Sequence, residues 1–442
     1  MSSPGIDVDA LIDDRADAGI FRVRRDVFHD PAIFALEMEH IFEGTWLFLG
    51  LECQIPAPHD FFTTTLGRQP IIVMRDGAGR VGAFLNTCRH RGGLVCPLRA
   101  GTARFHVCPY HGWAYDSAGR NVAITERAAG RYSPEFDAEG HDLLPVARFG
   151  NYRGFLFASL SAGVPTLEEF LGPAATFIDL VIDQGADGVE FVPGTVRYTY
   201  NGNWKLQLEN NLDQYHFSAT HASFAGLIAR RSETAPAPAP DTEPVGQGTF
   251  SLPNGHAVMW TNRYSANALR PLFQDPQQVA LLTQRVGPLR AKWMRHNRNL
   301  SLFPNMQISD FSATLLRVLR PLAPDKTEMT AYCLALKGES AEARRRRIRQ
   351  FEEFFNPGGL ATPDDNVMYE TAQAGITAAP RAWTQGYMRG TAVAAEPDLR
   401  HAQELGIAPV HSAEGTVALG DETCLHAGYR EWRRLMRRAT AD

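Results

Sequence analysis

The sequence has few cysteines, no long apolar run and little net charge. Six cysteines among 442 residues are too sparse for a disulfide scaffold, so cysteines that cluster favour metal ligation or reactive thiols. No stretch approaches the roughly 18 uncharged apolar residues of a membrane span, and the acidic N-terminus lacks the apolar core of a secretory signal. A net charge of −5 argues against a nucleic-acid binder with a basic face. We therefore expect a cytoplasmic protein that binds neither membranes nor nucleic acid.

Changes in hydrophobic periodicity and in turn signals divide the chain into three segments. Residues 1–43 are expected to be helical, because apolar residues recur at close to helical spacing between Pro31 and Phe42. Residues 44–163 carry the signals of a small all-β domain, including a hairpin around Asp76-Gly77. Residues 164–442 mix strands and helices. The predicted fold class is therefore α+β, with an all-β domain joined to a larger domain that contains an antiparallel sheet.

Hydrophobic periodicity predicts individual elements in the larger segment. The strands are expected near residues 256–260, 311–319 and 327–335. The helices are expected near residues 276–296, 340–355, 363–375 and 426–438. Residues 232–248 are too rich in proline for regular structure and are typical of a lid, a binding loop or a mobile segment.

Two short motifs each offer one thiolate and one imidazole. Cys88-Arg-His90 is followed after 17 residues by Cys108-Pro-Tyr-His111. Zinc fingers normally pair like with like, whereas a Rieske centre holds one iron by two cysteines and the other by two histidines. The pattern therefore predicts a Rieske [2Fe–2S] cluster, with a structural zinc ribbon or two unrelated Cys/His pairs as the alternatives. Tyr110 and Trp113 flank the second motif, and we expect them to shield the cluster and to donate hydrogen bonds.

A second constellation lies between residues 204 and 221. Its apolar residues recur at helical spacing and are expected to face the core: Trp204, Leu208, Leu212 and Tyr215. Asp213 and His216 are three residues apart and lie on neighbouring ridges. His216 and His221 are five apart, which is about 140° around a regular helix, so both can bind one ion only if the helix ends or bulges between them. Polar residues at a helix boundary would show the same spacing, so the spacing alone leaves both interpretations open.

Carboxylates near these histidines supply further candidates. Glu209 and Asp213 lie one helical turn apart and would repel by a few tenths of a kcal/mol, so at least one is expected to have a designated partner. A third metal ligand could come from Asp364 or Asp365. Both aspartates also complement the start of a helix that Thr362 is expected to cap, and that role explains them without a metal.

Together, the two constellations resemble the oxygenase α subunit of Rieske non-haem iron ring-hydroxylating dioxygenases. The resemblance runs from Ile41-Phe-Glu-Gly-Thr-Trp46 to beyond Asp364-Asp365-Asn366, and it implies a Rieske domain ahead of a helix-grip catalytic domain. It implies that the cluster ligands are Cys88, His90, Cys108 and His111. It also implies that a mononuclear Fe(II), with positions open for dioxygen, is held by His216, His221 and Asp365, with Glu209 and Asn210 in the surrounding shell. Asp365 is preferred because it is the second aspartate of the matching pair.

Further motifs resemble the benzoate, toluate, anthranilate and p-cumate dioxygenases: Gly67-Arg-Gln-Pro70, residues 147–155, Asn203-Trp-Lys205, Glu209-Asn210 and Phe354-Phe-Asn-Pro357. Because these enzymes act on aromatic carboxylates, the resemblance implies an aromatic acid as substrate. A buried cation should meet its carboxylate, and Arg197, Arg263 and Arg298 lie in the appropriate segment. One departure is Asn211-Leu212, where benzoate-type enzymes usually carry Gly-Ala, so the pocket is expected to differ.

The resemblance also implies a reaction and partners. A reductase fed by NADH, directly or through a ferredoxin, reduces the cluster, and the electron passes from His111 through the Asp213 carboxylate to the iron held by His216 of an adjacent subunit. Both atoms of O2 then add to the ring as a cis-diol. Such α subunits usually trimerise with three small β subunits as α3β3, and otherwise as α3. Two alternatives are a monooxygenase that hydroxylates a salicylate-type acid and a Rieske electron carrier without an oxygenase site; residues 164–442 argue against the carrier.

Overall fold

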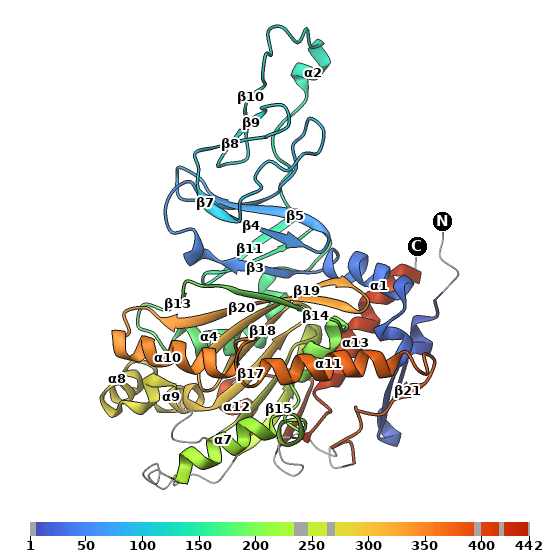
Figure 1. Cartoon of the computed structure of the whole chain (residues 1–442), viewed down its shortest axis with the longest axis vertical. Coiled ribbons are helices and arrows are strands. Elements are labelled where there is room, and N and C mark those ends of the chain that lie inside the picture. Colours follow the sequence, from blue (N-terminus) through green and yellow to red (C-terminus); the bar gives the residue numbers. More distant parts are fainter. Residues whose placement is uncertain (1–5, 234–245, 263–269, 393–398, 415–419, 441–442) are drawn as a thin grey trace. The chain divides into compact units, whose positions relative to one another are not determined.

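The structure is a computed structural model that describes residues 6–233, 246–262, 270–392, 399–414 and 420–440. It contains two compact units (Figure 1). Unit 1 comprises Met1–Ile41 and Glu168–Asp442, and unit 2 comprises Phe42–Leu167. The limits expected for the middle domain, residues 44 and 163, lie within four residues of those of unit 2. None of the helices in the described ranges has the length and hydrophobicity that crossing a bilayer requires.

Unit 2 is built from antiparallel strands. Its described part contains a four-stranded sheet of order β6-β5-β4-β7 and two three-stranded sheets of orders β10-β9-β8 and β11-β12-β3. The expected hairpin is present, because β5 and β6 pair across the Asp76-Gly77 turn with Arg75 opposite Val81. The elements are β3 Leu47–Leu51, β4 Asp60–Leu66, β5 Gln69–Arg75, β6 Val81–Leu85, β7 Ala100–Thr102, β8 Phe105–Val107, β9 Ala114–Asp116, β10 Asn121–Ala123, α2 Pro134–Ala138, β11 Arg148–Tyr152 and β12 Phe155–Ser159.

The first 43 residues are less helical than the sequence predicts. Ile12–Arg15 (β1) and Ile20–Arg24 (β2) form an antiparallel hairpin, which Trp383–Thr384 (β21) extends into a three-stranded sheet. The α-helix in this segment is Pro31–Glu37 (α1), which continues as a π-helical turn over Met38–Phe42. Buried and partly exposed residues alternate along β2, but a period of two over five residues is too short a signal to outweigh the longer helical pattern that follows.

One antiparallel sheet dominates unit 1. In the described residues the strand order is β13-β20-β19-β18-β17-β16-β15-β22, and β14 also pairs with β20. The strands are β13 Val189–Phe191, β14 Val196–Tyr200, β15 Gln247–Ser251, β16 Ala257–Thr261, β17 Asn297–Leu302, β18 Met306–Asp310, β19 Thr314–Ala323, β20 Lys326–Leu336 and β22 His411–Glu414. An antiparallel sheet with helices packed on it is the architecture that the α+β prediction describes, and that prediction is confirmed.

Helices α10 and α11 lie across one face of this sheet (Figure 1). Two apolar clusters attach them: Phe351 and Phe355 pack with Leu315 and Cys333, and Tyr369 packs with Leu319 and Met329. The helices of unit 1 beyond α1 are α3 Leu167–Leu171, which begins at the last residue of unit 2, α4 Ala174–Ile182, α5 Trp204–Asn210, α6 Phe217–Thr220, α7 Ala222–Glu233, α8 Pro276–Val286, α9 Pro288–Arg295, α10 Ala341–Phe354, α11 Thr362–Ile376, α12 Arg400–Leu405 and α13 Leu425–Met436.

Most of the predicted elements of the larger segment are present with shifted ends. The helix expected over 276–296 is two helices, because Gly287 adopts φ 83° and Pro288 starts a new one. The periodicity does not reveal β17, β18 or α4. Of the proline-rich stretch 232–248, residues 234–245 lie outside the described residues, residues up to Glu233 belong to α7, and β15 begins at Gln247.

A buried ion pair fixes the start of α5. Lys205 Nζ lies 2.5 Å from Glu37 Oε1, and both side chains are at most 2% exposed. The indole N–H groups of Trp204 and Trp432 donate to the same carboxylate at 2.9 and 2.7 Å. Burial lowers the pKa of Lys205, and the Glu37 charge opposes that shift. These contacts join α1, α5 and α13 at one carboxylate.

Replacing Glu37 should therefore be costly. Glu37→Ala leaves a buried ammonium group and two indole donors without their acceptor, and we expect unit 1 to lose about 3–5 kcal/mol of stability. Glu39→Ala, at an exposed position two residues away, should change stability by less than about 0.5 kcal/mol. Calorimetric unfolding of both variants provides the measurement, and equal stabilities would contradict the role assigned to Glu37.

Candidate functional site

Unit 2 carries its two Cys/His motifs on loops with the same hydrogen bonding. Two bonds close the first loop: Cys88 N–H to Gly93 O at 2.8 Å, and Gly92 N–H to Cys88 O at 2.9 Å. The same two bonds close the second: Cys108 N–H to Trp113 O at 2.8 Å, and Gly112 N–H to Cys108 O at 2.9 Å. Gly92 and Gly112 both have positive φ, 71° and 75°, which glycine adopts without a steric cost. The two loops therefore present their side chains from matching backbone geometry.

The four side chains form a pair of thiols and a pair of imidazoles. Cys88 and Cys108 are buried, and the rings of His90 and His111 have centroids 4.4 Å apart. The buried Nδ1 atom of His90 has no hydrogen-bond partner, which leaves its lone pair available to a metal. The arrangement fits a two-iron cluster better than a single tetrahedral zinc ion.

The aromatic residues around this site differ in part from expectation. Trp113 is buried and stacks on His90 with ring centroids 5.1 Å apart, so it shields the pair of rings. Tyr110 packs against His111 but is 60% exposed, and its hydroxyl makes no hydrogen bond within the described residues. The hydroxyl near the cysteines belongs instead to Tyr115, which is fully buried and lies 3.3 Å from Cys88 Sγ. Tyr115 was not among the predicted site residues; its place in β9, directly after the second motif, is the only sequence signal for it.

In unit 1, the chain leaves helical geometry before His216 and again at His221. Helix α5 ends at Asn210, and His216 precedes the short helix α6. His221 follows α6 with φ −102° and ψ 33°, which interrupts the helix again before α7. The sequence places the break between the two histidines, but residues 217–220 form one helical turn and the interruption lies at His221 itself. Because α5 ends so early, the helical spacing does not reach Tyr215, which is 56% exposed rather than in the core.

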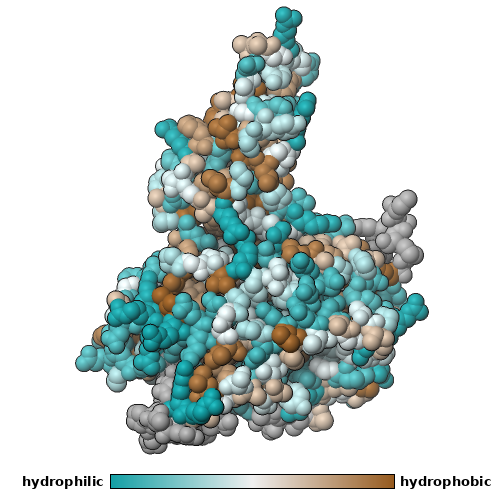
Figure 2. All heavy atoms as spheres, viewed as in Figure 1, coloured by the Kyte–Doolittle hydropathy of each residue, from teal (hydrophilic) through white to brown (hydrophobic). Residues whose placement is uncertain are grey.

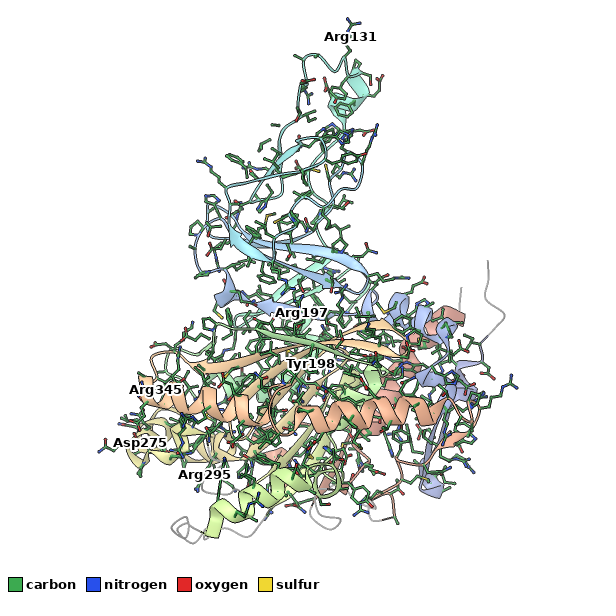
Figure 3. The ribbon with its side chains drawn as sticks, in the orientation of Figure 1. Arg131, Arg197, Tyr198, Asp275, Arg295 and Arg345 are labelled. Carbon is green, nitrogen blue, oxygen red and sulfur yellow. The ribbon has the colours of Figure 1, made fainter. Side chains whose placement is uncertain are left out.

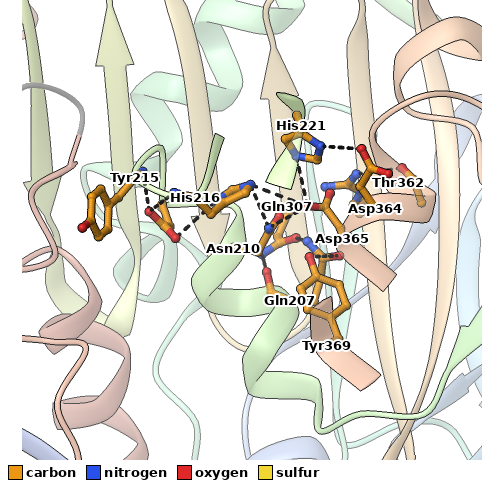
Figure 4. A network of polar contacts seen from close by, with 12 residues as sticks. Gln207, Asn210, Tyr215, His216, His221, Gln307, Thr362, Asp364, Asp365 and Tyr369 are labelled. Carbon is orange, nitrogen blue, oxygen red and sulfur yellow. Dashed lines mark hydrogen bonds and ion pairs between the residues drawn. The ribbon is translucent and has the colours of Figure 1, made fainter. Parts of the chain in front are cut away.

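Each histidine ring has its Nδ1 atom beside a carboxylate (Figure 4). His216 Nδ1 lies 3.2 Å from Asp213 Oδ2, and His221 Nδ1 lies 3.4 Å from Asp364 Oδ2. A ring that donates its Nδ1–H to a carboxylate presents the lone pair of Nε2 to a metal. The Nε2 atoms of both rings face Asp365 Oδ1, at 3.5 Å from His216 and 3.2 Å from His221. His216, His221 and Asp365 thus offer three donor atoms within 4.8 Å of one another, a set that fits a metal ion.

The two adjacent aspartates have different surroundings. Asp365 is 6% exposed and faces both rings, whereas Asp364 contacts only His221. Burial disfavours the charged form of His221, but the two carboxylates outweigh it and raise its pKa. Thr362 does not cap α11 as predicted: the cap position is Ala361, and the Thr362 hydroxyl donates to Phe355 O at 2.9 Å.

The two further residues expected around the metal lie differently. Asn210 Nδ2 donates to Asp365 Oδ1 at 3.1 Å and to His216 Nε2 at 3.2 Å, so it contacts the triad. Glu209 does not; it accepts hydrogen bonds from the Tyr387 and Tyr429 hydroxyls, and burial raises its pKa to about 7. These tyrosines are the designated partners that the Glu209–Asp213 spacing predicts.

A cavity of about 610 Å³ opens onto the three donor atoms. That volume is sufficient for a substituted aromatic ring. The apolar part of its wall includes Phe217, Phe224, Ile228, Met259, Phe311, Phe354 and Phe355. Asn211 also lines the cavity and is fixed by hydrogen bonds to Ser301 and Ser309, whereas Leu212 does not line it. Of the Asn211-Leu212 pair, the asparagine is therefore the residue that lines the pocket.

Comparison with known proteins identifies the family. The model "Ring hydroxylating alpha subunit (catalytic domain)" matches residues 192–438, and the model "Rieske [2Fe-2S] domain" matches residues 45–137. The chain belongs to the ring-hydroxylating dioxygenase α-subunit family. It is 42% identical to toluate 1,2-dioxygenase subunit alpha of Pseudomonas putida, over 84% of this chain and 83% of that one. It is 39% identical to the anthranilate 1,2-dioxygenase large subunit of Acinetobacter baylyi, over 91% and 87% of the two chains.

Solved structures show the same fold. Naphthalene 1,2-dioxygenase from Rhodococcus sp. bound to indole superimposes with a TM-score of 0.80 at 25% identity, covering 94% of each chain. The α subunit described here therefore pairs a Rieske [2Fe–2S] domain with the catalytic domain of a non-haem iron dioxygenase, an enzyme that uses O2. Both the zinc-ribbon alternative and the electron-carrier alternative are wrong, because the chain contains the Rieske domain and the oxygenase domain together.

The different surroundings of the two aspartates lead to a prediction about iron content. Asp365→Ala removes one of the three converging donors, so iron should fall from three per chain toward two while the red-brown colour of the cluster remains. Asp364→Ala removes only a contact to His221 Nδ1. The metal affinity should fall by roughly 10- to 100-fold, and the variant should still retain close to three irons per chain. Elemental analysis of both variants measures this, and the reverse pattern would show that Asp364 is the ligand.

Tyr115 should raise the reduction potential of the cluster. A hydroxyl that donates to a ligand sulfur stabilises the more negative, reduced cluster, so Tyr115→Phe should lower the midpoint potential by about 60 mV, a tenfold change for one electron. Tyr110→Phe, at an exposed hydroxyl, is the matched control and should leave the potential unchanged. A redox titration followed by electron paramagnetic resonance gives both values; identical potentials in Tyr115→Phe and wild type would reject the contact.

Proposed function

We propose that this chain is the terminal oxygenase component that cis-dihydroxylates an aromatic carboxylate, with electrons from NADH delivered by a reductase. The observation that carries the proposal is the cavity of about 610 Å³ beside the three converging donors. Its apolar wall suits a ring, and its lining also contains arginines. The names of three relatives at 38–42% identity point to the same substrate class, namely toluate, anthranilate and 2-halobenzoate dioxygenases.

In this proposal the ligand sets are those named from the sequence. Cys88, Cys108, His90 and His111 hold the cluster, and His216, His221 and Asp365 hold the mononuclear iron. When bound, that iron supplies the activation of O2. The protein residues fix the geometry: Asp213 and Asp364 orient the two rings, Asn210 holds Asp365, and the phenylalanines around the cavity exclude water from the ring of the substrate.

Asp213 has a second role in this proposal. One of its oxygens lies beside His216 Nδ1, while the other accepts the Tyr215 N–H at 2.6 Å. The side chain remains 28% exposed, so it can accept a further hydrogen bond from outside its own chain. We assign that donor to His111 of a neighbouring copy, which makes Asp213 the bridge for the electron between subunits.

Exposed hydrophobic side chains of unit 2 support an assembly of this kind. Figure 2 shows hydrophobic residues at the surface of this unit, and those that are at least 47% exposed are Leu94, Leu98, Phe105, Val107, Tyr110 and Val122. Several lie next to the cluster loops in sequence, where contact with another subunit would bury them. We propose a trimer, α3 or α3β3 with a small β subunit, that acts in the cytoplasm, where NADH is available to the reductase.

A substrate screen tests the proposed reaction. The holoenzyme with a reductase should oxidise at least one of benzoate, anthranilate, salicylate and p-cumate, and 18O2 should place two labelled atoms in the product. One labelled atom would instead identify the monooxygenase alternative. If none of these acids stimulates dioxygen uptake by an enzyme preparation that oxidises naphthalene, an aromatic acid is rejected as the substrate.

The bridge at Asp213 makes a separate prediction. Asp213→Asn is nearly isosteric, so the variant should keep close to three irons per chain and accept electrons from its reductase normally. Turnover should fall by orders of magnitude, because the charged acceptor that positions the His216 ring is lost. Stopped-flow oxidation of the reduced cluster, with substrate and O2 present, is the measurement. A wild-type rate would mean that Asp213 is a structural acid only.

A further inference from the structure

One face of β19 is apolar except at its middle residue. Side chains two residues apart point to the same side of a strand, so Leu315, Arg317 and Leu319 form one row. Leu315 packs under α10, and Leu319 packs under α11. Arg317 is 5% exposed, and its cross-strand partners in the sheet are Gln307 and Ala331. A charged side chain is therefore buried where α10 ends and α11 begins.

The contacts of Arg317 do not neutralise its charge. Its Nη2 atom lies 3.5 Å from Thr362 Oγ1, and its guanidinium carbon lies 5.7 Å from the centre of the Phe355 ring. Its buried Nε atom has no hydrogen-bond partner. In the described part of the chain, no carboxylate lies within ion-pair distance of it. Burying a guanidinium group is unfavourable unless it is paired with an anion, so the fold holds a cation whose partner must come from elsewhere.

Two other candidate arginines, Arg298 and Arg197, are engaged or lie away from the cavity. Arg298 lines the cavity, but it pairs with Asp310 and also donates to the Trp293 and His296 carbonyls. Arg197, on β14 (Figure 3), does not line the cavity, and its side chain is 39% exposed with Glu328 at 4.0 Å. Arg263 lies outside the described residues. Arg317 lines the cavity, and in the described residues it is the cavity arginine without a carboxylate partner.

We propose that Arg317 binds the carboxylate of the aromatic substrate, an inference that rests on the proposed function. The planar guanidinium group matches a carboxylate with two parallel hydrogen bonds, and one of them would use the Nε atom that now lacks a partner. Thr362, which contacts Arg317, lies one helical turn before Asp365 on α11. Thr362 beside Arg317 and the metal ligand Asp365 therefore belong to the same turn of helix. Because Arg317 lines the cavity that opens onto the metal, an acid held by Arg317 has its ring in that cavity.

The test compares an acid with a neutral analogue of similar shape. Benzoate and nitrobenzene are titrated anaerobically into the iron-loaded holoenzyme by calorimetry, with wild type, Arg317→Met and Arg320→Met. Arg320 is the matched control, because it lies on the same strand but faces the other way and contacts Glu328. Arg317→Met should bind benzoate roughly 10- to 100-fold more weakly, bind nitrobenzene no more weakly than wild type, and keep three irons per chain. Arg320→Met should match wild type for both probes.

Two outcomes would overturn the inference. Benzoate binding that is unchanged in Arg317→Met shows that the carboxylate is held elsewhere. Loss of the mononuclear iron in that variant shows that Arg317 acts as a support for Asp365 instead. If Arg317→Met does not fold, Arg317→Gln, which can still donate to Thr362, must show the same selective loss of benzoate binding. If the wild-type enzyme neither binds nor oxidises any aromatic acid, the proposed function itself fails. If the wild-type enzyme oxidises aromatic acids but the Arg317 variants bind benzoate as tightly as wild type, only this inference is rejected.

Discussion

The catalytic site depends on one constraint: two imidazole rings five residues apart must direct their Nε2 atoms at the same point. A continuous helix cannot do this, because its geometry separates the two side chains by about 140°. The chain ends α5 at Asn210, forms one short turn of helix and interrupts it at His221. Asp213 and Asp364 then hold the Nδ1 atoms. The fold therefore orients both rings through their Nδ1 atoms, using two carboxylates that are not among the three donors His216, His221 and Asp365.

The rest of unit 1 supports this arrangement. The buried Glu37–Lys205 pair and the indoles of Trp204 and Trp432 fix the start of α5. On the opposite side, α11 supplies Asp364 and Asp365 and is packed on the sheet through Tyr369. Between the end of α10 and the start of α11, the buried Arg317 side chain lies between the apolar contacts of Leu315 and Leu319. The converging donor atoms thus lie beside a cavity whose wall is largely apolar, and buried polar residues of the sheet also line it.

The sequence predicts the fold class and the family better than it predicts individual short elements and contacts. The family resemblance indicates His216, His221 and Asp365, whose spacing alone also fits polar residues at a helix boundary. The Cys/His motifs are recognisable because their chemistry needs particular residue types at particular spacings. The β1–β2 hairpin is not, because its strands are short and lie beside a stronger helical pattern. Tyr215 illustrates a second limit: helical periodicity continues in the sequence after the helix itself has ended. Tyr115 and Arg317 illustrate a third limit. The Tyr115 hydroxyl lies beside the Cys88 thiol, and Arg317 Nε has no hydrogen-bond partner. Only three-dimensional contacts reveal either feature.

The most direct test of the whole account is a crystal structure of the iron-loaded enzyme with benzoate bound under anaerobic conditions. We expect metal density between His216, His221 and Asp365, the aromatic ring in the cavity beside it, and the carboxylate against Arg317. An aromatic acid bound in this cavity with its carboxylate on another group would contradict the assignment of Arg317. Metal density at any other set of residues would contradict the account of the site as a whole.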